Sequence, residues 1–179
     1  MSKALCIVDM QDDYVWNEPH EKAIPRVIHE VVLAKRRKAN IFILEYHDWG
    51  KTVRPIMDSI GKYPYHRLIK FTDGGGYELQ SYALKNNLFI NKIRLCGINR
   101  GFCVYATAKE LKHLVPGISI SAAVNATWCA TPRKGLQRLA RVCKLLYHGD
   151  KIDSKQIRIN PKYKFTNDYD VDERKWRSS

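Results

Sequence analysis

Short apolar runs alternate along the chain with segments whose apolar residues recur every three or four positions. The runs are Ala4–Val8, Ile41–Tyr46, Ile93–Gly97 and Ile118–Val124. Runs of this length and composition are typical of strands that are buried on both faces of a parallel sheet. We therefore predict four core strands at these positions.

The intervening segments have the spacing of amphipathic helices. Helices are predicted over residues 24–39, 76–87 and 103–114, and a further helix begins at Pro132. The first of these carries Pro25 in its first turn and ends in the basic run Lys35–Lys38, both of which suit a helix. The last is expected to turn one apolar face inward, made of Leu136, Leu139, Ala140, Cys143 and Leu146.

Strands that alternate with helices predict an α/β protein. The expected fold is a three-layer α/β/α sandwich with a mainly parallel, Rossmann-like sheet. We expect one domain over residues 1–149, with residues 150–179 as a polar extension that packs on it and adds a short edge strand near Gln156–Ile159. Residues 47–74 look irregular and are a candidate active-site segment.

Polar residues follow each predicted strand. Asp9 follows the first strand, His47 and Asp48 the second, residues 97–103 the third, and Asn125 and Thr127 the fourth. Functional groups of open parallel sheets gather beyond the carboxyl ends of the strands. These side chains are therefore expected to meet at one edge of the sheet.

Cys103 stands where the third strand gives way to a helix. Free backbone N–H groups at a helix start favour a thiolate and could stabilise an oxyanion. Gly97 and Gly101 allow a tight backbone before it, and Asp9 is a candidate to take the thiol proton. Taken singly, Cys103 is better explained as a buried structural thiol, and Asp9 can be explained as a capping or loop carboxylate.

Length and composition describe a globular protein. The 179 residues suffice for one domain. There is no apolar run long enough for a membrane span and no signal pattern at the start, so we expect a cytoplasmic protein. The five cysteines lack CxxC pairs and zinc-like spacing, and most should be buried thiols.

The net charge of +13 is unusual for a chain of this length. Residues 1–150 hold 23 Lys and Arg against 13 Asp and Glu, so the excess is not confined to the tail. A basic surface suits an anionic partner, although a solvated surface without a partner is the simpler explanation unless the charges cluster.

Three blocks of the sequence resemble the isochorismatase-like cysteine hydrolases, which include nicotinamidases and carbamoylsarcosine amidases. The blocks are CIVDMQDDY, LIKFTDGGGYELQSYALKNN and LCGINRGFCVYATA, and the resemblance extends roughly from Ala4 to Leu146. Their order and spacing together make the resemblance specific.

The resemblance implies a catalytic triad of Asp9, Lys70 and Cys103. Cys103 would be the nucleophile, Asp9 the general base and then acid, and Lys70 the cation that keeps Asp9 charged. It also implies a cis peptide at Ile98–Asn99, which would aim backbone N–H groups at an oxyanion. The implied reaction is hydrolysis of an amide or ureido C–N bond through a thioester, without a cofactor.

The metal-binding members of the family carry histidines that this chain lacks. Asp48 is in place, but Gly50 stands where the first histidine would be, and only His66 resembles a ligand position. One carboxylate and one imidazole are too few for a tight site, and His47 is badly placed beside Asp48. We expect no metal and no nicotinamidase activity.

Five aromatic residues are candidates to line a substrate pocket, with core packing as the alternative for each: Tyr14, Trp16, Tyr77, Phe102 and Trp128. The segment Asp73–Tyr77 is unusually rich in glycine and predicts a wide or mobile pocket entrance. Asn125 replaces the aspartate that is usual in the family and can substitute for it by hydrogen bonding.

Two other functions are compatible with the sequence. One is a binding protein without catalysis, whose basic face (Lys35–Lys38, Lys134, Arg138 and Arg141) contacts nucleic acid or an acidic partner. The other is an isochorismate hydrolase, which cleaves a vinyl ether and does not need the cysteine. The family resemblance also implies a homo-oligomer. The positive charge is compatible with an anionic small-molecule substrate, and nucleic acid is a possible but less favoured partner.

Overall fold

A seven-stranded sheet forms the centre of the computed structural model, which describes residues 2–15, 21–128, 132–147 and 150–152. The strands are ordered β3-β2-β1-β4-β5-β6-β7. All neighbours from β3 to β6 run parallel, and β7 is antiparallel to β6. Their bounds are β1 (Ser2–Val8), β2 (Asn40–Tyr46), β3 (Tyr65–Lys70), β4 (Ile90–Ile98), β5 (Ser119–Trp128), β6 (Lys144–Tyr147) and β7 (Asp150–Ile152).

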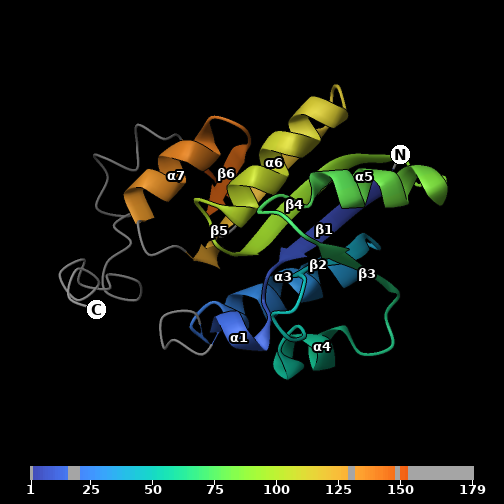
Figure 1. Cartoon of the computed structure of the whole chain (residues 1–179), viewed down its shortest axis with the longest axis vertical. Coiled ribbons are helices and arrows are strands. Elements are labelled where there is room, and N and C mark those ends of the chain that lie inside the picture. The colour runs from blue at the N-terminus through green and yellow to red at the C-terminus, as the bar shows by residue number, and fades with distance from the viewer. Residues whose placement is uncertain (1, 16–20, 129–131, 148–149, 153–179) are drawn as a thin grey trace.

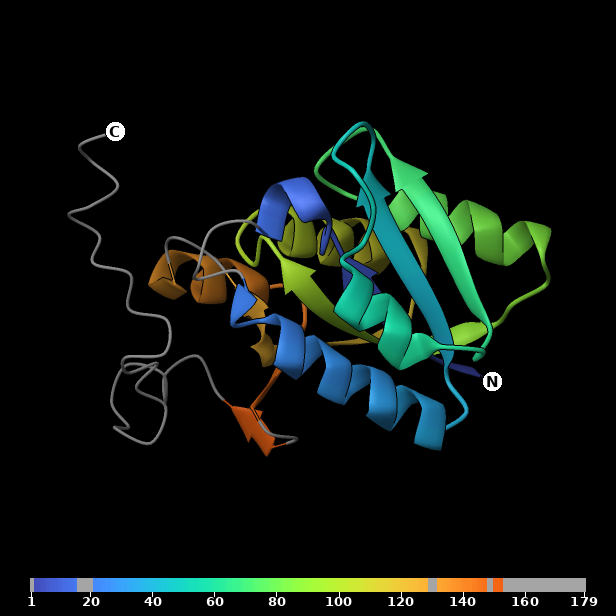
Figure 2. The ribbon, with the colours of Figure 1, turned by 90° about the horizontal axis from the view of Figure 1, so that it is seen from below.

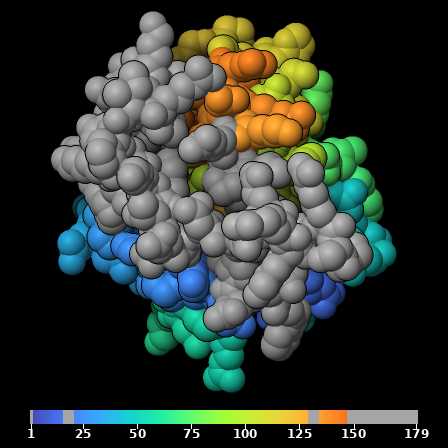
Figure 3. All heavy atoms as spheres, turned by 90° about the vertical axis from the view of Figure 1, so that its left-hand side faces the viewer, coloured from blue at the N-terminus to red at the C-terminus, as the bar shows by residue number. Residues whose placement is uncertain are grey.

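Helices cover both faces of this sheet (Figure 1). One face carries α5 (Gly76–Lys85), α6 (Cys103–Leu114) and α7 (Pro132–Ala140), and the other carries α1 (Asp12–Val15), α3 (Ile24–Arg36) and α4 (Arg54–Ile60). Figure 2 shows α3 and α4 side by side on their face. In Figure 3 the orange atoms of α7 and the blue atoms of α3 lie on opposite sides of the molecule. The predicted three-layer α/β/α sandwich with a mainly parallel sheet is confirmed.

The alternation of side chains along the strands produces two separate cores. In β1, Ala4, Cys6 and Val8 pack under α5 and α6, whereas Leu5 and Ile7 pack against α3. All five side chains are buried. An unbroken apolar run is therefore needed at β1, as the sequence pattern predicts.

The interpretation of residues 47–74 as irregular is wrong. This segment contains α4 and β3, which pairs in parallel with β2 from Ile41–Tyr65 to Tyr46–Lys70. β3 lies at the edge of the sheet, where only Leu68 and Lys70 of its side chains are buried. An edge strand needs little apolar content, so its sequence, YHRLIK, lacks the pattern of a core strand.

The sequence pattern ends β5 too early and the last helix, α7, too late. β5 continues to Trp128, so Asn125 and Thr127 lie within the strand rather than after it. Residues 144–147 form β6, so Leu146 does not continue α7, which ends at Ala140. In both places the pairing with a neighbouring strand decides the structure: Ile98 pairs with Trp128, and Ala123 with Leu146.

The end of the described chain adds β7 as a short edge strand. The strand expected near Gln156–Ile159 lies outside the described residues. Within the described ranges, no helix has both the length and the apolar character that crossing a membrane requires.

Candidate active site

Three polar side chains meet at the carboxyl edge of the sheet. Asp9 directly follows β1, Lys70 is the last residue of β3, and Cys103 is the first residue of α6, which follows β4. Parallel strands end at the same edge, so residues distant in the sequence come together there. The sequence prediction that Asp9 and Cys103 converge agrees with this arrangement.

Lys70 is completely buried and its ammonium group is surrounded by acceptors. Its Nζ lies 3.0 Å from Asp9 Oδ2 and donates hydrogen bonds to the carbonyl oxygens of Thr72 at 2.9 Å and Asp73 at 3.1 Å. It also lies 4.5 Å from the centroid of the Tyr46 ring. A buried ammonium needs such partners to remain charged.

Asp9 is 1% exposed and has a left-handed backbone conformation, with φ of 50°. Its N–H donates to the Leu44 carbonyl oxygen at 3.0 Å, which fixes the turn after β1. Burial raises the pKa of Asp9 to about 6, and the neighbouring Lys70 opposes that shift. The carboxylate is therefore ionised at neutral pH and able to accept a proton.

Cys103 is 7% exposed. Burial raises the pKa of the Cys103 thiol to about 12, and the nearby Asp9 carboxylate adds to the rise, whereas Lys70 and a backbone hydrogen bond from Asn99 lower it. This differs from the sequence argument, in which the helix start favours a thiolate. Desolvation and a like charge outweigh the helix start, so a thiol stands beside a carboxylate.

The Ile98–Asn99 peptide bond is cis, as the family resemblance implies. The Asn99 carbonyl oxygen accepts the N–H groups of Phe102 at 3.1 Å and Val104 at 3.0 Å. These bonds tie the turn before Cys103 to the first turn of α6. Asn99 and Cys103 thus belong to one tight loop that these hydrogen bonds close.

Arg100 anchors this loop to β5, a role that sequence reasoning missed. Its side chain is buried and donates to Thr127 Oγ1 at 2.8 Å, to the Val124 carbonyl oxygen at 2.9 Å and to the Thr127 carbonyl oxygen. Its own N–H donates to the Trp128 carbonyl oxygen at 2.7 Å. Arginines are rarely buried, so nothing in the sequence marks this one.

Gly97 allows β4 to approach β1 just before the loop. It has a φ of +109°, and a Cβ atom there would lie 2.0 Å from the Val8 carbonyl oxygen. No other residue tolerates both conditions. This close approach brings the chain before Cys103 next to the chain before Asp9.

The glycine-rich segment after Lys70 is packed rather than open, contrary to the prediction of a wide or mobile entrance. Gly74, Gly75 and Gly76 are all buried. The Gly75 N–H donates to Thr107 Oγ1 at 3.1 Å and the Gly76 N–H to Glu110 Oε2 at 2.8 Å. The glycines let this segment lie directly against α6. This contact fixes the position of the Thr72 and Asp73 carbonyl groups that accept hydrogen bonds from Lys70.

The predicted pocket aromatics separate into different environments. Tyr14 stacks on Trp49 with ring centroids 4.6 Å apart, and burial, together with the Asp9 carboxylate, raises the pKa of its hydroxyl group. Tyr77 and Phe102 are half exposed at the starts of α5 and α6.

Trp128 does not line the site. It is 2% exposed and belongs to the core under α3, on the opposite face from Cys103. The strand extension of β5 carries it there. Trp16 lies outside the described residues.

The candidate metal ligands are not brought together. His66 lies at the second position of β3, four residues before Lys70, and its Nδ1 is 2.9 Å from the Tyr82 hydroxyl. Asp48 is exposed and its Oδ2 pairs with His47 Nδ1 at 2.8 Å. Gly50 has a φ of +76°, which disfavours any side chain. Among the residues that the structure describes, no three metal-ligating side chains cluster.

Gln11 is a second positioning residue that the sequence argument did not assign. Its Nε2 donates to the carbonyl oxygens of Tyr46 and Gly50, both at 2.9 Å, and its Oε1 accepts the Tyr46 N–H at 2.6 Å. The side chain thus fixes the end of β2 beside β1. That end carries the Tyr46 ring against which the Lys70 ammonium packs.

No family model and no curated protein matches the sequence. Solved structures do. A nicotinamidase from Staphylococcus aureus aligns with a TM-score of 0.66 at 20% identity, over 79% of this chain and 91% of that one. An N-carbamoylsarcosine amidase from Thermoplasma acidophilum gives 0.69 at 17% identity, over 86% and 99%. The chain has the fold of the isochorismatase-like hydrolases.

A third similar structure carries a different activity in its name. The MAR1 ribonuclease from Caenorhabditis elegans gives a TM-score of 0.70 at 16% identity, over 91% of this chain and 86% of that one. The isochorismatase-like fold therefore hosts more than one chemistry, and the function has to be argued from the residues of this site.

Proposed function

We propose that this protein is a cysteine-dependent hydrolase that cleaves an amide or ureido C–N bond of a small molecule. The observation that carries the proposal is the buried contact between Lys70 and Asp9 beside the Cys103 thiol. Burying a charged pair is costly, and the core of this fold could be packed with apolar side chains instead. The fold shared with amidases supports the same reaction class.

In the proposed first step, Cys103 Sγ attacks the substrate carbonyl carbon while its proton passes to Asp9. The oxygen of the tetrahedral intermediate gains a negative charge, which the Asn99 and Cys103 N–H groups would stabilise. When the C–N bond breaks, the leaving amine takes the proton from Asp9. A thioester remains on Cys103.

The second step hydrolyses the thioester. Asp9 takes a proton from water, the resulting hydroxide adds to the thioester carbonyl, and the C–S bond breaks. Asp9 then returns the proton to the thiolate, and a carboxylic or carbamic acid leaves. Lys70 would keep Asp9 charged between the steps, because its ammonium stabilises the ionised carboxyl.

An anionic substrate is supported by Arg138 on α7. Its Nη1 donates to the Gly101 carbonyl oxygen at 3.3 Å, and its guanidinium lies 5.7 Å from the centroid of the Phe102 ring. Gly101 and Phe102 directly precede Cys103. A cation held at this place would attract a carboxylate or phosphate on the substrate.

The proposal is tested by measuring ammonia release from a panel of carboxamides, ureides and carbamates. Wild-type protein should turn over at least one compound, Cys103→Ala should not, and Cys143→Ala should match the wild type. Cys143 is a suitable control because it is a partly buried cysteine outside the site. Equal turnover by Cys103→Ala would refute the cysteine mechanism. If no compound of the panel is hydrolysed and the protein instead cleaves RNA or binds it in a salt-sensitive way, the nucleic-acid alternative would be favoured.

A further inference from the structure

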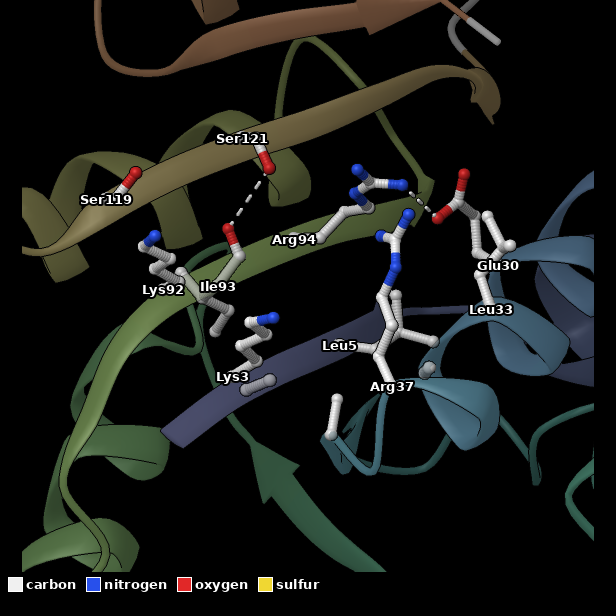
Figure 4. Close-up of a pocket in the computed structure, with 13 residues that line it drawn as sticks. Lys3, Leu5, Glu30, Leu33, Arg37, Lys92, Ile93, Arg94, Ser119 and Ser121 are labelled. Atoms are coloured by element: carbon white, nitrogen blue, oxygen red, sulfur yellow. Dashed lines mark hydrogen bonds and ion pairs between the residues drawn. The ribbon is translucent and has the colours of Figure 1, made fainter. Parts of the chain in front are cut away.

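A second concave site lies at the opposite end of the sheet from Asp9 and Cys103. It is a pocket of about 220 Å³ between the first residues of β1, β4 and β5 and the second half of α3. Figure 4 shows its polar side chains: Lys3, Lys92 and Arg94 from the strands, Glu30 from α3, Arg37 directly after α3, and Ser119 and Ser121 from β5. Asp9 lies six residues beyond Lys3 along β1, roughly 20 Å away at the rise of a strand.

The strand register places like charges next to each other in this pocket. Lys3 pairs with Lys92, and Lys92 with Ser119 on its other side. Neighbouring strands are only about 4.8 Å apart, so two ammonium groups project from adjacent positions on one face of the sheet. Like charges at adjacent positions destabilise a sheet, which suggests that the pair serves an anion.

The pocket holds more positive charge than its own carboxylate can balance. Glu30 Oε2 pairs with Arg94 Nη1 at 2.9 Å. In the described part of the chain, no carboxylate lies within ion-pair distance of Lys3, Arg37 or Lys92. Figure 4 shows the Arg37 and Arg94 guanidinium groups turned toward the same space. Three unbalanced cations therefore face one small cavity.

The remaining lining indicates what kind of anion fits. Ser119 and Ser121 offer hydroxyl groups on the floor of the pocket, and Ser121 Oγ donates a long hydrogen bond of 3.4 Å to the Ile93 carbonyl oxygen. The apolar wall is aliphatic, with Leu33 and Ala34 of α3, and none of the aromatic residues that the structure describes lines the pocket. Nucleic-acid bases are usually held by aromatic stacking, so the pocket suits phosphate groups rather than a strand of bases.

We propose that this pocket, the phosphate bay (Lys3, Arg37, Lys92, Arg94, Ser119 and Ser121), binds the diphosphate or triphosphate group of a small molecule. Such a group carries several negative charges, which match the three unbalanced cations, and it presents many acceptors for ammonium, guanidinium and hydroxyl donors. The bay is separate from the proposed hydrolytic site. A ligand bound there is therefore not the substrate whose C–N bond is cleaved.

Calorimetric titration of the full chain with tripolyphosphate at constant ionic strength tests the proposal. We expect one binding event per chain in the wild type. Lys3→Gln/Lys92→Gln should bind tripolyphosphate at least about tenfold more weakly than the wild type, because two charge-assisted contacts are lost. The matched control Lys85→Gln/Lys109→Gln removes the same charge from exposed positions outside the bay and should stay within about twofold of the wild type.

Two further measurements separate the proposal from its alternatives. Without ligand, Lys3→Gln/Lys92→Gln should melt at the same temperature as the wild type or higher, since a repulsion is removed, so weak binding would not reflect misfolding. ATP and ADP should compete with tripolyphosphate. Unchanged affinity of the double variant, equal losses in both double variants, or binding of single-stranded RNA without binding of tripolyphosphate would overturn the proposal.

Discussion

Lys70 Nζ lies 3.0 Å from Asp9 Oδ2, and neither side chain has more than 1% of its surface exposed. The two residues come from the ends of β3 and β1, with β2 between them in the sheet. A buried ion pair of this kind is stable only while both partners are present, because either charge alone would be left unpaired in the core.

Replacing Lys70 should therefore destabilise the fold as well as abolish turnover. Lys70→Met leaves the Asp9 carboxylate buried without its cation, and such a loss typically costs about 3–5 kcal/mol. Urea unfolding at pH 7 measures it. The double variant Asp9→Asn/Lys70→Met removes both charges and should recover at least half of the lost stability. A free energy of unfolding of Lys70→Met within about 1 kcal/mol of the wild-type value would contradict this description of the ion pair.

Hydrolysis should depend on the ionisation of Asp9. Since burial raises the pKa of Asp9 to about 6, the carboxyl is protonated below that pH and cannot accept the thiol proton. With an uncharged substrate, kcat/KM should rise with pH and reach half of its maximum near pH 6. A rate that stays constant down to pH 4.5 would exclude Asp9 as the base.

Thiol alkylation should separate the reactivity of Cys103 from its proposed catalytic role. The Asp9 charge raises the pKa of Cys103, so Asp9→Asn should increase the thiolate fraction and speed labelling by iodoacetamide at pH 9, while turnover is lost. Peptide mapping after a timed reaction gives the rate at Cys103. Labelling of Cys103 that is slower in Asp9→Asn than in the wild type would show that the carboxylate does not oppose the thiolate.

Gly97 should be intolerant of any side chain. In Gly97→Ala the new methyl group would lie 2.0 Å from the Val8 carbonyl oxygen at a φ of +109°, and we expect a loss of about 4 kcal/mol or failure to fold. Gly117→Ala is the matched control. It has a φ of +81° but no atom within 4 Å of the added Cβ, so only about 1 kcal/mol should be lost. Chemical denaturation compares the two, and equal losses would show that backbone conformation alone explains both.

The sequence predicts most of the fold because apolar runs and helical spacing are local properties. β1, β2 and α6 lie where the pattern places them, and α6 begins at Cys103 as predicted. β3 was missed because an edge strand needs no apolar run. The true end of β5 was missed because its pairing with β4 carries the strand past the polar Asn125.

The sequence predicts which residues form the candidate site, but not how deeply they are buried or which charges surround them. Asp9 and Cys103 follow strands, and the resemblance supplied Lys70. Burial and neighbouring charge depend on tertiary contacts that no local pattern encodes, so the raised pKa of Cys103 could not be foreseen. The roles of Arg100 and Gln11, which hold the loop before Cys103 and the end of β2, are equally non-local.

The most direct test of the proposed mechanism is intact-mass spectrometry of acid-quenched reactions with a turned-over substrate, followed by peptide mapping. We predict a mass increase equal to the acyl part of the substrate, located on Cys103 in the wild type and absent from Cys103→Ala. Turnover with no adduct on Cys103 in the wild type, together with full activity in Cys103→Ala, would contradict a covalent cysteine mechanism.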